Sequence, residues 1–195
     1  AKVIAVNDLG GAVINKKGLN IPELFKHIAK TNTVKGFSGG EPYDEPILEL
    51  ECNVLIPAAI GGVITSDNAE KIKANVIIEG ANSPTTLNAD KILRENGTFI
   101  IPDILANAGG ITASYFEWVQ NTQNYLWKEK ELHEKLIDVM ITAFEEIWII
   151  SQKQTCDLRT AALIKGIKRV AAAKLKRGLF CLLYTSDAAD ETGRV

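Results

Sequence analysis

The sequence lacks an excess of either charge, a long apolar run and a cysteine motif, and each absence excludes a class of protein. Its 22 basic and 24 acidic side chains leave a formal net charge of −2, which gives no electrostatic footprint for nucleic acid or an anionic membrane. No uninterrupted apolar stretch is long enough to cross a bilayer. We therefore expect neither a nucleic-acid partner nor a membrane partner.

The cysteines and histidines are too few and too scattered to form a framework or a metal site. Cys52, Cys156 and Cys181 are far apart and form no C-x-x-C pair, so reduced thiols and a cytoplasmic location are expected. His27 and His133 lie in polar helical stretches, which is typical of surface residues. The sequence thus predicts no metal site and offers no clear catalytic base.

Four short apolar runs predict the strands of a parallel sheet. They are rich in β-branched residues and show no polar alternation, which is typical of strands that are buried on both faces. The stretches between them have the pattern of helices, so βαβ units are expected. After residue 107 the pattern predicts helices alone. The runs are residues 3–6, 54–56, 76–78 and 99–101, and the helices are predicted at residues 21–31, 66–74, 85–96, 111–121, 128–153 and 158–177.

Small or amide residues follow all four apolar runs. Ligands of open parallel sheets bind beyond the carboxyl ends of the strands, where small residues admit them and amides orient them. Four such ends on one edge of one sheet predict a binding crevice. They are Asn7-Asp8 before Gly10-Gly11, Pro57-Ala58-Ala59 before Gly61-Gly62, Glu79-Gly80-Ala81-Asn82, and Pro102-Asp103 shortly before Asn107.

Asp8 is the most informative single residue in this set. A carboxylate at the end of the second strand of a dinucleotide-binding fold accepts hydrogen bonds from the adenosine ribose. Its negative charge also repels a 2′-phosphate, which favours NAD over NADP. The alternative is an ordinary turn residue. The G-x-G-x-x-G turn that binds the phosphates would lie about 20 residues upstream, and we expect it outside this chain.

Several segments resemble the glutamate dehydrogenase family, from residue 1 to about residue 179. The longest match is also the most specific. The segments are VIAVND at residues 3–8, VLIPAA at residues 54–59, ANSPTT at residues 81–86, PDILANAGGITASYFEWVQN at residues 102–121 and LRTAA at residues 158–162.

This resemblance implies an NAD(P)-dependent enzyme that deaminates L-glutamate oxidatively to 2-oxoglutarate and ammonia, and that runs the reverse reaction. A hydride would move between the substrate and the nicotinamide ring. The full-length protein would be a homo-hexamer. The implied cofactor-binding residues are Asn7, Asp8, Ala58, Ala59, Asn82 and Asn107, and the implied substrate-binding residues are Ile111 and Ser114.

The resemblance also places the catalytic lysine and aspartate of the family in an N-terminal substrate domain. We therefore expect this chain to be a fragment that contains no catalytic residue and does not turn over glutamate alone. Asn7 stands where relatives often have serine, which leaves the choice between NAD and NADP open.

The predicted fold is α/β: a Rossmann-like, mostly parallel sheet, incomplete at its N-terminus, followed by C-terminal helices. We assign residues 1–125 to a partial dinucleotide-binding domain and residues 126–180 to the C-terminal helices. Residues 181–195 lack a periodic apolar face, so a non-native or disordered tail is expected there.

Two other functions stay open. A branched-chain or aromatic amino-acid dehydrogenase of the same family would need an apolar residue at position 114, and Ser114 argues against it. A noncatalytic nucleotide-binding module would need none of the residues that we expect in the N-terminal domain.

Overall fold

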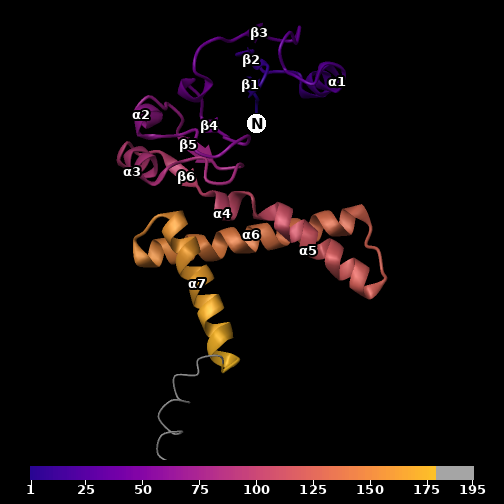
Figure 1. The fold of residues 1–195 in the computed structure, drawn as a ribbon, viewed down its shortest axis with the longest axis vertical. Coiled ribbons are helices and arrows are strands. Elements are labelled where there is room, and N and C mark those ends of the chain that lie inside the picture. The colour runs from indigo at the N-terminus through magenta and orange to yellow at the C-terminus, as the bar shows by residue number, and fades with distance from the viewer. Residues whose placement is uncertain (179–195) are drawn as a thin grey trace, which may run out of the picture. The chain divides into compact units, whose positions relative to one another are not determined.

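The computed structural model describes residues 1–178 (Figure 1). The chain divides into two compact units, of which the first is Ala1–Asn107 and the second begins at Ala108. The first unit contains two small sheets, and the described part of the second contains helices. The tail predicted at residues 181–195 lies outside the described residues.

The first sheet is antiparallel, which corrects the prediction that residues 3–6 belong to the parallel sheet. It has the order β1-β2-β3, and Asp8 pairs with Gly11 where the chain turns from β1 into β2. Gly10 sits in this turn, where a Cβ would lie 2.1 Å from the hydroxyl oxygen of Thr33. The two glycines thus lie in the turn of a β-hairpin. The strands are β1 (Ala5–Asp8), β2 (Gly11–Ile14) and β3 (Glu41–Pro42).

Helix α1 (Ile21–Thr31) has the bounds that the sequence predicts. Asn20 caps its first turn by accepting a hydrogen bond from the N–H of Glu23, and Asn32 ends it in the left-handed conformation. Leu24 is the buried residue of this helix and packs in one core with residues of the first sheet and its loops. That core consists of Val13, Leu19, Leu24, Val34 and Phe37.

The second sheet is parallel, as predicted for the other three apolar runs. It has the order β4-β5-β6, with Val54 paired with Val76 and Val76 paired with Phe99. Ile77, in the central strand, is fully buried. The strands are β4 (Val54–Leu55), which follows the 3-10 turn Ile47–Glu49, β5 (Val76–Ile78) and β6 (Phe99–Ile101).

Helices α2 (Ser66–Ala69) and α3 (Leu87–Glu95) lie side by side against this sheet (Figure 1). The predicted helix 66–74 is too long, because α2 ends at Ala69 and residues 70–75 connect it to β5, which begins at Val76. Helix α3 begins after the cap Thr86, and Gly97 follows its end with a φ of +83°, as expected for a glycine there. A short helix, α4 (Asp103–Ala106), follows β6.

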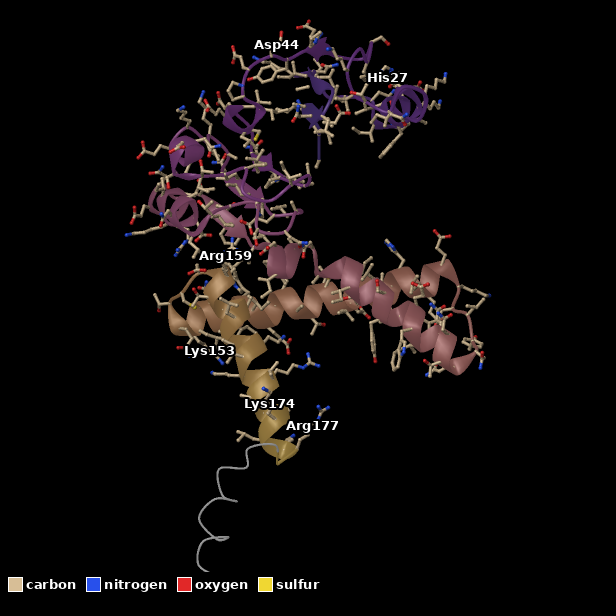
Figure 2. All side chains as sticks on the ribbon, viewed as in Figure 1. His27, Asp44, Lys153, Arg159, Lys174 and Arg177 are labelled. Atoms are coloured by element: carbon tan, nitrogen blue, oxygen red, sulfur yellow. The ribbon has the colours of Figure 1, made fainter. Side chains whose placement is uncertain are left out.

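The second unit contains α5 (Ala108–Gln123), α6 (Glu129–Gln154) and α7 (Leu158–Lys176). All three were predicted, with ends that differ by at most three residues. Helix α6 packs against both of the others. Lys174 and Arg177 lie at the end of α7, where positive charge complements the helix dipole (Figure 2). No helix within residues 1–178 is long and apolar enough to span a membrane.

Candidate functional site

Two loops run side by side at the carboxyl edge of the parallel sheet. One follows β4 and the other follows β5. The N–H of Ala81 donates to the carbonyl of Pro57 at 2.9 Å, and the N–H of Gly62 donates to the carbonyl of Ser83 at 2.8 Å. Ile64 and Thr85 continue this pairing as an isolated parallel bridge. The backbone of one loop therefore fixes the backbone of the other.

Small residues make this close approach possible. A Cβ on Gly80 would lie 3.1 Å from the Cβ of Ala58, and a Cβ on Gly61 would lie 2.8 Å from the carbonyl oxygen of Asn82. Ala58 and Ala59 are exposed, so their methyl groups border the loop surface. The edge thus has little side-chain bulk, which allows a ligand to approach the backbone closely.

Asn82 and Asn107 meet at this edge. The Asn107 side-chain nitrogen donates to the side-chain oxygen of Asn82 at 2.7 Å and reaches the carbonyl of Gly80 at 3.4 Å. Neither the Asn82 side-chain nitrogen nor the Asn107 side-chain oxygen has a partner within residues 1–178. The pair therefore presents one amide donor group and one amide acceptor.

Two carboxylates support the edge, and the sequence analysis did not single them out. Glu79 is fully buried, and its Oε2 accepts a hydrogen bond from the N–H of Asp103 at 2.8 Å. Asp103 Oδ2 in turn accepts from the N–H of Ser83 at 2.7 Å. A charged residue directly after a buried strand was the available signal, since burial of a carboxylate requires hydrogen-bond donors.

Ser83 adopts a left-handed backbone conformation with a φ of +47°. Such a conformation costs a non-glycine residue roughly 1–2 kcal/mol. A hydrogen bond to a charged group contributes about 1.5–3 kcal/mol, so the bond from the N–H of Ser83 to Asp103 offsets this cost. Backbone positions in sparsely populated conformations cluster at functional sites.

Asp8 lies at the end of β1 in the antiparallel sheet, and not in the parallel sheet to which the sequence assigned it. Its Oδ1 accepts from the N–H of Gly10 at 2.8 Å and from the hydroxyl of Thr33 at 2.9 Å, and its Oδ2 accepts from the N–H of Val34 at 2.7 Å. Partial burial raises the pKa of Asp8, but these hydrogen bonds outweigh it and hold the pKa below its ordinary value of 3.8. The carboxylate thus ties the β1–β2 turn to the chain after α1.

Asn7 also serves the β1–β2 turn in this structure. Its side-chain nitrogen donates to the carbonyl of Gly11 at 2.9 Å and to the carbonyl of Asp8 at 3.2 Å. Within the described residues, no hydrogen bond joins Asn7 or Asp8 to the Asn82–Asn107 pair. Their contact with a ribose stays a prediction.

Ile111 and Ser114 lie one turn apart on α5, in the second unit, and both are exposed. Ile111 is 76% exposed, while the hydroxyl of Ser114 donates to the carbonyl of Gly110 at 3.2 Å. Residues 1–178 contain no group of three or more His, Cys, Asp or Glu side chains placed to hold a metal ion.

An open parallel sheet with small and amide residues beyond its carboxyl ends places this unit among the α/β proteins, which bind their ligands at that edge. Comparison of sequences makes the assignment specific. The model of a family described as glutamate/leucine/phenylalanine/valine dehydrogenase matches residues 1–178. The chain belongs to this family.

Individual relatives agree with the family match. The chain is 44% identical over 181 residues to the glutamate dehydrogenase of Thermotoga maritima, a match that covers 92% of this chain and 44% of that relative. It is 45% identical over 178 residues to the catabolic NAD-specific glutamate dehydrogenase RocG of Bacillus subtilis, covering 91% of this chain and 42% of RocG.

Solved structures agree as well. The leucine-bound hetero-hexameric glutamate dehydrogenase from Thermus thermophilus superimposes with a TM-score of 0.84 at 27% identity, over 90% of this chain and 42% of that one. The chain therefore spans less than half the length of each of these three relatives.

Proposed function

We propose that this chain is the cofactor-binding part of an NAD(P)-dependent glutamate dehydrogenase. The full-length protein would deaminate L-glutamate oxidatively to 2-oxoglutarate and ammonia, and would catalyse the reverse reaction. The observation that carries this proposal is the Asn82–Asn107 pair at the carboxyl edge of the parallel sheet, in a chain of this family.

The residues at this edge fit a nicotinamide cofactor. A carboxamide has one donor group and one acceptor, and the side-chain nitrogen of Asn82 and the side-chain oxygen of Asn107 offer the complementary pair. Ala58 and Ala59 leave room beside them because both are small and exposed. When bound, the nicotinamide ring supplies the hydride acceptor of the oxidation. The two asparagines orient it and limit its rotation.

Asn7 and Asp8 are proposed to contact the adenosine ribose. A carboxylate has about four acceptor positions, so the three hydrogen bonds on Asp8 leave capacity for a ribose hydroxyl. Its lowered pKa keeps it ionised near neutral pH, and the negative charge disfavours a 2′-phosphate. We therefore propose NAD as the preferred cofactor, with NADP as the alternative that Asn7 leaves open.

Ser114 and Ile111 are proposed to bind the substrate. The hydroxyl of Ser114 is exposed, and it is able to exchange its helix carbonyl for the side-chain carboxylate of glutamate. A site that pairs a carboxylate discriminates strongly against leucine or phenylalanine, which lack it. This favours glutamate over the other substrates in the name of the family.

The test uses the full-length protein that contains this chain. Reduction of NAD and of NADP is followed by absorbance with L-glutamate, L-leucine or L-phenylalanine as substrate. We expect kcat/KM with NAD to be at least about 100-fold higher for glutamate than for leucine. A preference for leucine or phenylalanine would support the other dehydrogenases, and nucleotide binding without turnover would support a noncatalytic module.

Variants locate the activity on the asparagine pair. Asn82→Ala and Asn107→Ala are expected to lower kcat/KM, since each removes one of the two groups that orient the nicotinamide. Asn88→Ala is the matched control, because Asn88 is an exposed asparagine on α3 in the same unit. Equal effects of all three substitutions would contradict the proposed site.

We also propose that the full-length protein is a homo-hexamer. The Thermus thermophilus relative is a hetero-hexamer. Light scattering measures the mass of the assembly directly, and a stable monomer would contradict this proposal.

A further inference from the structure

Two hydrogen bonds connect the loop after β5 to the two ends of α4. Ser83 donates its N–H to Asp103, the first residue of the helix, and Asn82 accepts from Asn107, the residue after its last. Asn82 and Ser83 are neighbours in sequence. Asp103 and Asn107 are one helical turn apart, and the N–H of Asn107 donates to the carbonyl of Asp103 at 3.0 Å. The loop is therefore held at two points on one rigid helical turn.

Glu79 fixes the helical turn to the sheet. Its N–H donates to the carbonyl of Ile101 at 3.1 Å, which extends the β5–β6 pairing by one residue. Its side chain is fully buried and accepts from the N–H of Asp103. A buried carboxylate requires hydrogen-bond donors, and the N–H of Asp103 is one that Glu79 uses.

The two carboxylates thus form a chain of contacts that leads to the asparagine pair. Glu79 orients Asp103, and Asp103 holds the N–H of Ser83 in its left-handed conformation. Ser83 is joined covalently to Asn82, so the position of the Asn82 side chain depends on this bond. We name Glu79, Asp103 and the N–H of Ser83 the carboxylate latch.

We propose that Glu79 and Asp103 are positioning residues for hydride transfer, which act by holding Asn82 and Asn107 in register. This inference rests on the proposed function. The latch residues orient the asparagines and take no part in the chemistry. Loss of the latch lets Asn82 move away from Asn107, and the nicotinamide then samples unproductive orientations. Because the remainder of the cofactor site is unchanged, kcat should fall much more than cofactor affinity.

The main test compares Asp103→Ala and Asp103→Asn in the full-length protein. We expect Asp103→Ala to lower kcat on the order of 10- to 100-fold, while the Kd of NADH from fluorescence titration changes by less than about threefold. Asp103→Asn keeps a hydrogen-bond acceptor but loses the charge, so its kcat should lie between that of wild type and that of Asp103→Ala. Glu79→Gln also keeps a hydrogen-bond acceptor, and it should likewise lower kcat while the Kd of NADH stays nearly unchanged.

Asp90→Asn is the matched control. Asp90 is 5% exposed, lies in the same unit on α3, and accepts a hydrogen bond from Arg94 Nε at 2.8 Å. Its substitution should lower Tm and leave kcat within about twofold, because it alters no residue at the sheet edge. Should Asp103→Ala fail to fold, Asp103→Asn and Glu79→Gln carry the comparison. An unchanged kcat in these folded variants, or a loss of kcat equal to that of Asp90→Asn, overturns the proposal.

A second measurement is independent of turnover. If Asp103 and Asn107 hold the same loop, the decreases in the urea midpoint from Asp103→Ala and Asn107→Ala should be clearly less than additive in the double variant. Additive decreases would show that the two bonds act separately, which overturns the latch. A wild-type protein that oxidises no amino acid refutes the proposed function. The comparison of the two single variants with the double variant then still decides whether Asp103 and Asn107 act together on the loop.

Discussion

Substitution of Gly61 by alanine tests how tightly the two loops at the sheet edge are packed. The added Cβ would lie 2.8 Å from the carbonyl oxygen of Asn82 and 3.3 Å from that of Ser83. An ordinary carbon–oxygen contact is about 3.3–3.6 Å, so the loops must separate by roughly half an ångström. Both obstructing atoms belong to the backbone, which cannot turn aside as a side chain would.

The cost follows from this displacement. Overpacking of this kind destabilises a protein by about 1–3 kcal/mol. Alanine also restricts the unfolded chain, which returns about 0.4–1 kcal/mol. The net loss in the free energy of unfolding is therefore about 0–2.6 kcal/mol, centred near 1.3 kcal/mol. A shift of Asn82 by half an ångström should also lower kcat, roughly tenfold, since a misplacement of 1 Å costs about 100-fold.

Thermal unfolding and steady-state kinetics of the full-length protein measure the two effects. Gly166→Ala is the control, because a Cβ on Gly166 meets nothing within 4 Å and the residue lies inside α7. That variant should be more stable than wild type by about 0.5–1 kcal/mol. The reasoning is refuted if Gly61→Ala is as stable and as active as wild type, or if the two alanine variants change stability in the same direction.

Three further predictions concern other residues. Asp8→Asn should lower Tm near neutral pH, because the ionised Asp8 carboxylate, whose pKa is lowered in the folded protein, stabilises the fold. The effect on Tm should shrink as the pH falls below 3.8, since protonation of Asp8 removes this stabilisation. A Tm difference that does not change between about pH 7 and pH 3 would contradict this. Thr85→Val should stabilise the protein by about 1 kcal/mol, since the buried hydroxyl of Thr85 has no partner within residues 1–178; a lower urea midpoint would show that the hydroxyl is satisfied in solution. Ser114→Leu should lower kcat/KM for L-glutamate by about 100-fold or more relative to that for L-leucine, and an unchanged substrate preference would remove Ser114 from the proposed substrate site.

The candidate site was partly predictable from the sequence. Asn82 and Asn107 follow two apolar runs, and the carboxyl ends of adjacent parallel strands share one edge of a sheet. The sequence pattern therefore predicts both at one edge, and in the structure a hydrogen bond of 2.7 Å joins their side chains. Their role toward a cofactor stays a proposal.

The residues that support this pair were not predictable in the same way. Glu79 and Asp103 are separated by 24 positions, and their contact depends on the register between β5 and β6. Residue types alone do not specify that register. The left-handed conformation of Ser83 has no signal in the sequence either, since the hydrogen bond that accompanies it joins Ser83 to a residue 20 positions away.

Local interactions explain why the sequence by itself determined most of the elements. Helix α1 has a cap at Asn20, a proline in its first turn and a left-handed residue at its end, all within a few positions. The three C-terminal helices have long apolar repeats, and β4, β5 and β6 have short runs without polar alternation. Each of these signals lies within one helix or strand, so it can be recognised in the sequence without knowledge of the rest of the chain.

Tertiary structure alone decided which strands pair and what the polar residues contact. Gly10 and Gly11 are compatible with a ligand-binding turn or with a hairpin, and the structure has a hairpin there, with Thr33 close to Gly10. That choice places Asp8 in an antiparallel sheet, with its carboxylate on Thr33 and Val34. Pairing and hydrogen bonding between distant segments depend on the three-dimensional path of the chain, which no local pattern encodes.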